Sequence, residues 1–337
     1  MMKIFKNAVA VALVLCCIRY ACGEEKFVLK LATLAPEGTT WMNTMEEMNE
    51  QIKKQSNGRL RIQFYPGGVM GDELDVIRKM RFNQVHAAGF SGVGLGKVLP
   101  DVRVLDLPYL FYSYEEVDYV HQKLLDHFKR AYDKEGYILA GWAEAGFVYM
   151  FSQSSACDRE SFRKVKLWAW QDDPLAKAAF DGMGISTIPL PITDVMTSLQ
   201  VGMVDSFYSP PLATIALQWY TRVKYMCTFP ITHATGAVLI NKKYYEKLPD
   251  DLKKILDDNF STYLQTLIVR TRDDNEKSKE TLRKNGIVML EAADKEVEEL
   301  AVESGKVWYN LAGKIYSREL LDQVLALINE VRNDKKN

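Results

Sequence analysis

Histidine is scarce in this chain, and the patterns that bind metals are missing. Only four of 337 residues carry an imidazole: His86, His121, His127 and His233. His121 and His127 are six positions apart, about 240° around a helix, so they cannot share one helix face. No H-E-x-x-H, C-x-x-C or EF-hand pattern occurs. We therefore predict no metal and no cofactor, and we expect His233 to be a hydrogen-bonded structural residue.

The signatures of several other function classes are also missing. No G-x-S-x-G nucleophile elbow is present. The 43 basic residues balance 44 acidic ones, without a basic block that would bind nucleic acid. Gly92 to Gly96 lack the spacing of a dinucleotide-binding loop, and we expect a loop beside a cleft there. A carboxylate pair could still act as acid and base, although each candidate is better explained by capping or surface exposure: Glu37, Glu73, Glu144 and Asp205. We predict a protein that is not an enzyme.

Hydrophobic runs of membrane-spanning length are absent. The apolar run from Ala8 to Ile18 has 11 residues, whereas a bilayer requires ~20. It follows basic residues and precedes small ones, as in a secretory signal peptide spanning residues 1–23. A rival interpretation makes Cys22 a lipidated N-terminus. Both interpretations predict export to the periplasm.

Cysteine is sparse beyond that segment. Cys157 and Cys227 are the only two of five cysteines outside residues 1–23. An oxidising compartment allows them to pair, but the sequence does not show whether their Cα atoms approach within ~7 Å. The sequence leaves the pairing open and slightly favours the unpaired state.

The hydrophobic pattern predicts an α/β fold. Residues 28–34 and 59–64 alternate as strands, and an amphipathic helix capped by Thr39 or Thr40 lies between them. This β-α-β unit favours parallel pairing. Residues 250–284 contain neither proline nor glycine, and Asn285-Gly286 follows, so a single long helix is expected there.

Several motifs, in order, resemble those of the solute-binding subunits of TRAP transporters, the DctP family. Residues 65–73 match a Y-P-x-x-x-L-G-x-E turn, and residues 107–111 match an L-P-F/Y-L/M-F element. Residues 199–205 match L-Q-x-G-x-V/I-D after a proline-flanked helix start. The resemblance covers about residues 27–332. It implies a two-domain periplasmic binding protein with hinge strands and a long helix spanning both domains.

Two positions depart from that family together. Family members carry an arginine that grips a substrate carboxylate in a K-I/F-R strand, where this chain has Trp168. A second arginine is common where this chain has Val148. Trp168 and Trp170 alternate along a strand, so both indoles face one side. We predict an apolar ligand site formed by Leu34, Phe90, Val148, Trp168, Trp170, Phe207, Tyr208 and Ser209.

The resemblance implies domain I over residues 27–147 and 234–275, domain II over residues 148–233 and 276–332, and a tail at 333–337. It implies capture of a small hydrophobic or amphiphilic ligand in the interdomain cleft and delivery to TRAP permease subunits. Arginine-lacking members resemble a subclass that works with a TPR-repeat periplasmic lipoprotein. Two alternatives remain: an organic-acid binder that uses another cation such as Arg103, or a ligand-free scaffold or exported enzyme on this fold.

Overall fold

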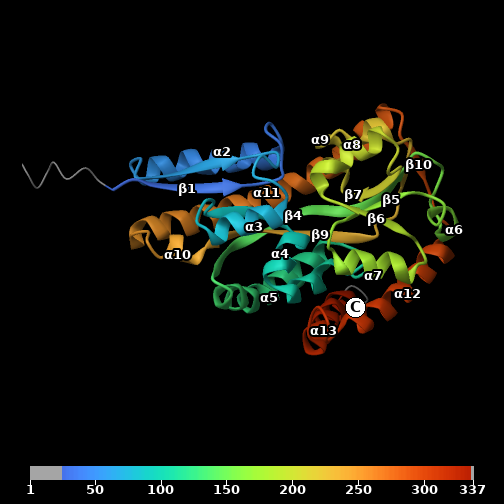
Figure 1. Cartoon of the computed structure of the whole chain (residues 1–337). Coiled ribbons are helices and arrows are strands. Elements are labelled where there is room, and N and C mark those ends of the chain that lie inside the picture. Colours follow the sequence, from blue (N-terminus) through green and yellow to red (C-terminus); the bar gives the residue numbers. More distant parts are fainter. Residues whose placement is uncertain (1–24, 335–337) are drawn as a thin grey trace, which may run out of the picture.

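The structure is a computed structural model that describes residues 25–334. The predicted signal peptide and the possible lipid anchor at Cys22 lie outside the described residues. Figure 1 shows two lobes, each with a sheet flanked by helices, joined by long strands and backed by one long helix. Within residues 25–334, no helix is both long enough and apolar enough to cross a membrane.

The first lobe is built on a β-α-β unit, as the sequence predicts. Strand β1 pairs in parallel with β2 and β3, and β3 pairs antiparallel with β9. Helix α2 is capped by Thr39, whose hydroxyl accepts from the backbone of Met42. The elements are β1 (Phe27–Ala32), α2 (Thr40–Gln55), β2 (Leu60–Tyr65), α3 (Glu73–Arg81), β3 (Ala87–Ser91), α4 (Gly92–Val98), η1 (Pro100–Asp106), α5 (Tyr114–Lys134) and α10 (Lys242–Tyr245).

Two long strands connect the lobes: β4 (Tyr137–Ser152) and β9 (Thr232–Asn241). They pair antiparallel up to Val148, and from Tyr149 onward β4 pairs with β7 of the second lobe. Register shifts interrupt the β4–β9 ladder between Leu139 and Gly141 and between Glu144 and Gly146. Gly146 has a φ of +100°, and a Cβ there would lie 2.5 Å from Asn275 Nδ2, so glycine is required. The part of β4 that passes from the first lobe to the second is therefore irregular and depends on glycine at position 146.

In the second lobe, β5 lies in parallel between β6 and β7, while β8 pairs with β4 and β10. Helices α7 and α12 pack against each other on its outer side. The elements are α6 (Arg159–Phe162), β5 (Leu167–Trp170), α7 (Pro174–Gly182), β6 (Thr187–Leu190), η2 (Ile192–Asp194), α8 (Val195–Gln200), β7 (Ser206–Ser209), α9 (Pro211–Ala216), η3 (Trp219–Arg222), β8 (Tyr225–Cys227), β10 (Val288–Leu290), α12 (Asp294–Leu311) and α13 (Arg318–Asp334).

Helix α11 (Asp250–Lys284) confirms the predicted long helix at both ends. Its 35 residues correspond to roughly 50 Å. It packs against α2 and β4 and then against α9 in the second lobe. Asn275 on this helix donates to the carbonyl of Ala145 (2.9 Å) and accepts from the amide of Leu212 (3.0 Å). One side chain therefore ties β4 to α9.

Cys157 and Cys227 form a disulfide, so the slight preference for unpaired cysteines was wrong. Their Cα atoms are 5.4 Å apart, within the range that a disulfide spans. Cys227 ends β8, and Cys157 precedes α6. The 70-residue separation of the two cysteines hid a contact that only the folded second lobe creates.

The glycine run from Gly92 to Gly96 is a helix, not the expected loop. Ser91 caps it by accepting from the amide of Val93. A Cβ on Gly94 would lie 2.6 Å from Glu73 Oε2, and Cβ atoms on the other two glycines would collide with Asp106 and Arg103. The glycines therefore admit buried charged side chains close to the backbone of α4.

Candidate functional site

A cavity of about 270 Å³ lies between the two lobes. Strands β3, β4 and β9 and helix α2 contribute lining residues from the first lobe, while β5, β7, α9 and η3 contribute them from the second. Two hydrogen bonds beside it join the lobes. Trp170 Nε1 donates to Asp72 Oδ2 (3.0 Å), and Lys97 Nζ donates to the carbonyl of Asp172 (2.6 Å). The described conformation thus has both lobes in contact around the cavity.

The structure brings together seven of the eight residues predicted to bind the ligand. Leu34 comes from the turn after β1, Phe90 from β3 and Val148 from the crossover of β4. The members that line the cavity are Leu34, Phe90, Val148, Trp168, Trp170, Tyr208 and Ser209. Their shared location makes a common role possible, and their contact with a ligand stays a prediction.

Phe207 is the exception, since it is not among the lining residues. It is fully buried, stacks on Phe151 with ring centroids 5.0 Å apart, and meets Trp219 edge-on at 5.1 Å. Successive residues of a strand point to opposite faces. Tyr208 therefore faces the cavity while Phe207 belongs to the core behind it.

Trp168 forms the centre of an aromatic cluster at the cavity wall. Its ring stacks on Tyr208 at 5.3 Å and meets Trp219 edge-on at 5.4 Å. Its indole Nε1 donates to the carbonyl of Leu190 (3.0 Å). Trp170 lies 5.9 Å away on the same side, as the alternation predicts. The ring of Trp168 is thus fixed and its polar atom is satisfied within the protein.

Sequence reasoning missed a large part of the apolar wall. The missed residues come from α2 and from the segment after β7, where Pro210-Pro211 opens a short apolar helix directly at a strand end. They include Trp41, Leu212, Ala213, Ala216, Leu217 and Trp219. Because α9 directly follows β7, which carries the predicted site residues Tyr208 and Ser209, its position in the sequence could have indicated that α9 lines the cavity. Trp41 offered no such indication, because it reads as one more apolar residue of the α2 core face.

No lysine, arginine or histidine lines the cavity in the described part of the chain. Lys166, which neighbours the aromatic strand, donates to the carbonyl of Gly202 instead. The charged lining residues are two carboxylates, Glu73 and Glu144. Of the other weighed carboxylates, Glu37 is exposed, and Asp205 accepts from the amide of Lys166.

Glu144 is compensated by the partly buried Arg272. Arg272 Nε and Nη2 donate to its two carboxylate oxygens at 2.7 and 2.8 Å. Burial alone would raise the pKa of Glu144, but the hydrogen bonds from Arg272, together with the proximity of His233, outweigh burial and lower the pKa to about 2. Glu144 is therefore ionised, with both oxygens already engaged.

Glu73 has no such cation. Its oxygens accept from the amide of Ser91 (2.6 Å), the hydroxyl of Ser91 (2.8 Å) and the amide of Gly94 (2.6 Å). Burial outweighs these hydrogen bonds and raises the pKa of Glu73 to about 8. Burial thus favours the protonated form of Glu73 near neutral pH.

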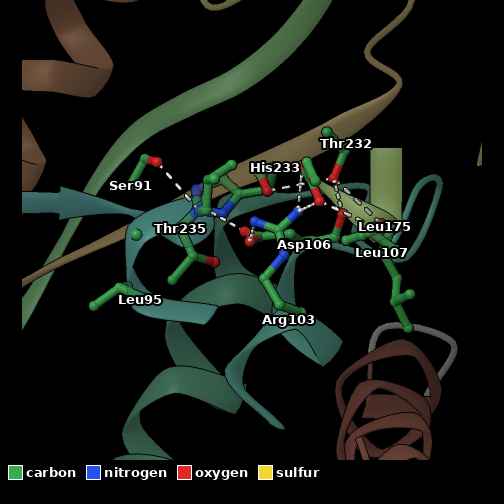
Figure 2. A network of polar contacts seen from close by, with 12 residues as sticks. Ser91, Leu95, Arg103, Asp106, Leu107, Leu175, Thr232, His233 and Thr235 are labelled. Atoms are coloured by element: carbon green, nitrogen blue, oxygen red, sulfur yellow. Dashed lines mark hydrogen bonds and ion pairs between the residues drawn. The ribbon is translucent and has the colours of Figure 1, made fainter. Parts of the chain in front are cut away.

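Arg103, the alternative cation for an organic acid, does not line the cavity. Its guanidinium donates to Asp106 Oδ2 (3.0 Å) and to both oxygens of Asp173 (3.0 and 2.8 Å). Figure 2 shows Arg103 beside Asp106, with Thr232 and Thr235 of β9 bonded nearby. Two carboxylates saturate this arginine, so it is not available to a ligand.

His233 is buried, but it is not hydrogen-bonded as expected. Neither of its ring nitrogens has a hydrogen-bond partner among the described residues, and Nε2 lies 3.4 Å from Glu144 Oε2. Its ring meets those of Phe111, Phe147 and His121. Residues 25–334 contain no cluster of histidine, cysteine and acidic residues suited to a metal ion.

The model of the family described as bacterial extracellular solute-binding protein, family 7, DctP, matches residues 31–314. The chain belongs to this family. A solute-binding protein from Verminephrobacter eiseniae is 25% identical over 294 residues, covering 82% of this chain and 86% of that protein. The C4-dicarboxylate-binding periplasmic protein DctP of Rhodobacter capsulatus is 23% identical, with 84% of each chain covered.

Solved structures share the two-domain fold. The sugar acid binding protein DctPAm of Advenella mimigardefordensis, in complex with galactonate, has a TM-score of 0.86 at 19% identity and covers 91% of this chain and 99% of its own. A periplasmic solute-binding protein from Shewanella oneidensis with bound succinate has a TM-score of 0.84 at 14% identity, with 90% and 99% covered. These likenesses show the fold, whereas membership of the family rests on the family model.

Proposed function

We propose that this solute-binding protein captures a small hydrophobic or amphiphilic ligand in the interdomain cavity and delivers it to membrane permease subunits. The carrying observation is the cavity wall, which is mainly aromatic and aliphatic and has no lining cation within residues 25–334. Apolar pockets with few polar anchors suit such ligands. The seven lining residues Leu34, Phe90, Val148, Trp168, Trp170, Tyr208 and Ser209 would contact the ligand.

The lack of a lining cation among residues 25–334 separates this proposal from the ligands of the solved relatives. Several structural relatives are described with bound acids, among them galactonate and succinate. Burying a ligand carboxylate without a cationic partner costs several kcal/mol of binding free energy. Trp168 and Val148 stand at the two positions where the resemblance places arginine. Arg103 is saturated by Asp106 and Asp173. An organic acid would therefore enter this cavity uncompensated.

The partners follow from the family. Permease subunits would receive the ligand, and a TPR-repeat periplasmic lipoprotein is the proposed additional partner, since the missing arginines resemble that subclass. A pull-down with the mature protein that recovers permease subunits without any TPR-repeat protein would remove the second partner.

The decisive experiment is organic extraction of the purified protein followed by mass spectrometry. A stoichiometric lipid-like molecule is expected, and a stoichiometric small polar acid would refute the apolar assignment. Trp168→Ala should lower ligand retention. Trp142→Ala is the matched control, because Trp142 is also buried and donates its Nε1 to a carbonyl, that of His121, but does not line the cavity. Equal loss in both variants would mean that destabilisation, not the site, explains the result.

A further inference from the structure

A tight turn in the second lobe is bound by the first lobe at three places. The turn runs from Trp170 to Asp173 and joins β5 to α7, and the amide of Asp173 donates to the carbonyl of Trp170 (3.3 Å). Its third residue, Asp172, has a φ of +58°, which residues other than glycine seldom adopt. Strained residues of this kind persist where surrounding contacts hold them, and they are frequent in switch regions. The contacts around this turn therefore matter for its conformation.

The first two contacts are hydrogen bonds between the lobes. Nε1 of Trp170 donates to Oδ2 of Asp72, the residue that caps α3 (3.0 Å). Nζ of Lys97, in α4, donates to the carbonyl of Asp172 (2.6 Å), so the strained residue is bonded directly to the first lobe. Because donor and acceptor belong to different lobes, both bonds must break when the lobes separate.

The third contact is a buried ion pair. Arg103 Nη2 donates to both carboxylate oxygens of Asp173 (3.0 and 2.8 Å), and the two side chains are 9% and 4% exposed. Neither residue lines the cavity. The protein itself thus provides the pairing of charge between the lobes, outside the space that a ligand occupies. Among residues 25–334, the cavity wall offers no cation through which an anionic ligand could join the lobes.

Trp170 links the turn to the cavity. Of the residues in the three contacts, it alone lines the cavity. Asp72 accepts its indole N–H from the other lobe, so this bond fixes the indole in the cavity wall only while the lobes are together. A ligand shifts an equilibrium between two conformations only through its different affinity for them. A ligand that packs against this ring would therefore favour the closed arrangement.

We propose that the turn from Trp170 to Asp173 is a latch that holds the lobes closed without the charge of a ligand. Asp72 is the positioning residue that couples ligand contact at Trp170 to closure. The ligand-free protein is then mostly closed, and a ligand adds to closure by packing against Trp170. This property does not depend on which ligand the cavity takes.

Double electron–electron resonance between spin labels on the two lobes measures the closed fraction. Glu50→Cys on α2 and Lys164→Cys after α6 place the labels where the side chains are 69% and 70% exposed. Cys157 and Cys227 are joined in the disulfide and do not take a label. Unfolding and dialysis first remove any bound ligand, and mass spectrometry checks the removal. The refolded protein should show mainly the label distance that corresponds to the structure. A distribution dominated by a longer distance would overturn the latch.

Removal of one indole N–H tests the contribution of Trp170. Trp170→Phe keeps an aromatic ring in the wall and loses the bond to Asp72. The closed-to-open ratio should fall about fivefold, the equivalent of one hydrogen bond. Trp168→Phe is the matched control, because the N–H that it removes is bonded within the second lobe, to the carbonyl of Leu190. It should leave the ratio unchanged, and equal ratios in the two variants would refute the role of Trp170.

Asp72 needs a variant that separates latching from helix capping, since its Oδ1 also accepts from the amide of Glu73. Asp72→Ser keeps a capping oxygen but not the one that reaches Trp170. It should lower the closed-to-open ratio as much as Trp170→Phe does, and the two substitutions together should lower it no further. Lys97→Met should lower the ratio in addition to Trp170→Phe, because its bond is separate. Full additivity of Asp72→Ser and Trp170→Phe would refute the coupling through Asp72.

Discussion

Arg103 connects the two lobes through a buried ion-pair triad, and its removal should be strongly destabilising. The guanidinium lies in the first lobe with Asp106, while Asp173 caps α7 in the second lobe. The three side chains are 9%, 8% and 4% exposed. Breaking a buried pair by deleting one partner costs about 3–5 kcal/mol, because the remaining charge stays buried. Arg103→Met would strand two carboxylates.

Each stranded carboxylate keeps one backbone donor, Thr235 for Asp106 and Leu175 for Asp173. We therefore expect a loss of about 3–5 kcal/mol and not twice that value. Urea unfolding followed by circular dichroism should show a midpoint lowered on the order of 1 M. Arg78→Met breaks an exposed pair with Asp75 and should cost less than ~1 kcal/mol.

The interpretation also predicts a rescue. Replacing Asp106 and Asp173 by asparagine in the Arg103→Met background removes the stranded charges and should restore part of the stability. Small-angle scattering should show that Asp173→Asn alone expands the molecule, since the pair joins the lobes. Equal stability losses in Arg103→Met and Arg78→Met would refute the assignment of a buried, lobe-joining role to Arg103.

Three further predictions concern stability. Replacing Cys157 and Cys227 by serine should cost roughly 4 kcal/mol, because the disulfide closes a loop across 70 positions; an unchanged melting temperature under reducing conditions would contradict it. Glu73 has its folded-state pKa raised from 4.5 to about 8, so its contribution is fully present below pH 4.5 and is lost as pH rises to about 8. The change is ~5 kcal/mol at most, and Glu73→Gln should flatten the pH–stability curve over this window. Gly146→Ala should cost at least ~1 kcal/mol in unfolding titrations, because φ is +100° and Asn275 leaves no room for a Cβ.

Sequence patterns predicted a helix or strand correctly where the residues of that segment alone determine its structure. The long helix 250–284 needed only its lack of proline and glycine and its Asn285-Gly286 stop. Alternation likewise placed Trp168 and Trp170 on one face. Phe207 could not be placed this way, because its neighbour Tyr208 is also aromatic and nothing in the sequence says which of the two faces the core.

Long-range contacts account for what the sequence did not reveal. Each glycine from 92 to 96 reads locally as a loop residue, yet the segment is helical, and its glycines leave room for Asp106, Glu73 and Arg103 from other segments. Glu73 reads as one acid at a helix start, and only the fold shows that it is buried against the cavity. The burial of Glu73 beside the cavity depends on such contacts and was therefore missed.

The arginines near the cavity are paired with carboxylates of the protein itself. Arg103 forms ion pairs with Asp106 and Asp173. Arg272 forms ion pairs with Glu144 and Asp118. Both of these arginines are thus matched by carboxylates within the protein. The one lining carboxyl without a cation, Glu73, is neutralised by its proton. An anionic head group would therefore find no unmatched cation among the lining residues that the structure describes, which supports the proposed apolar ligand.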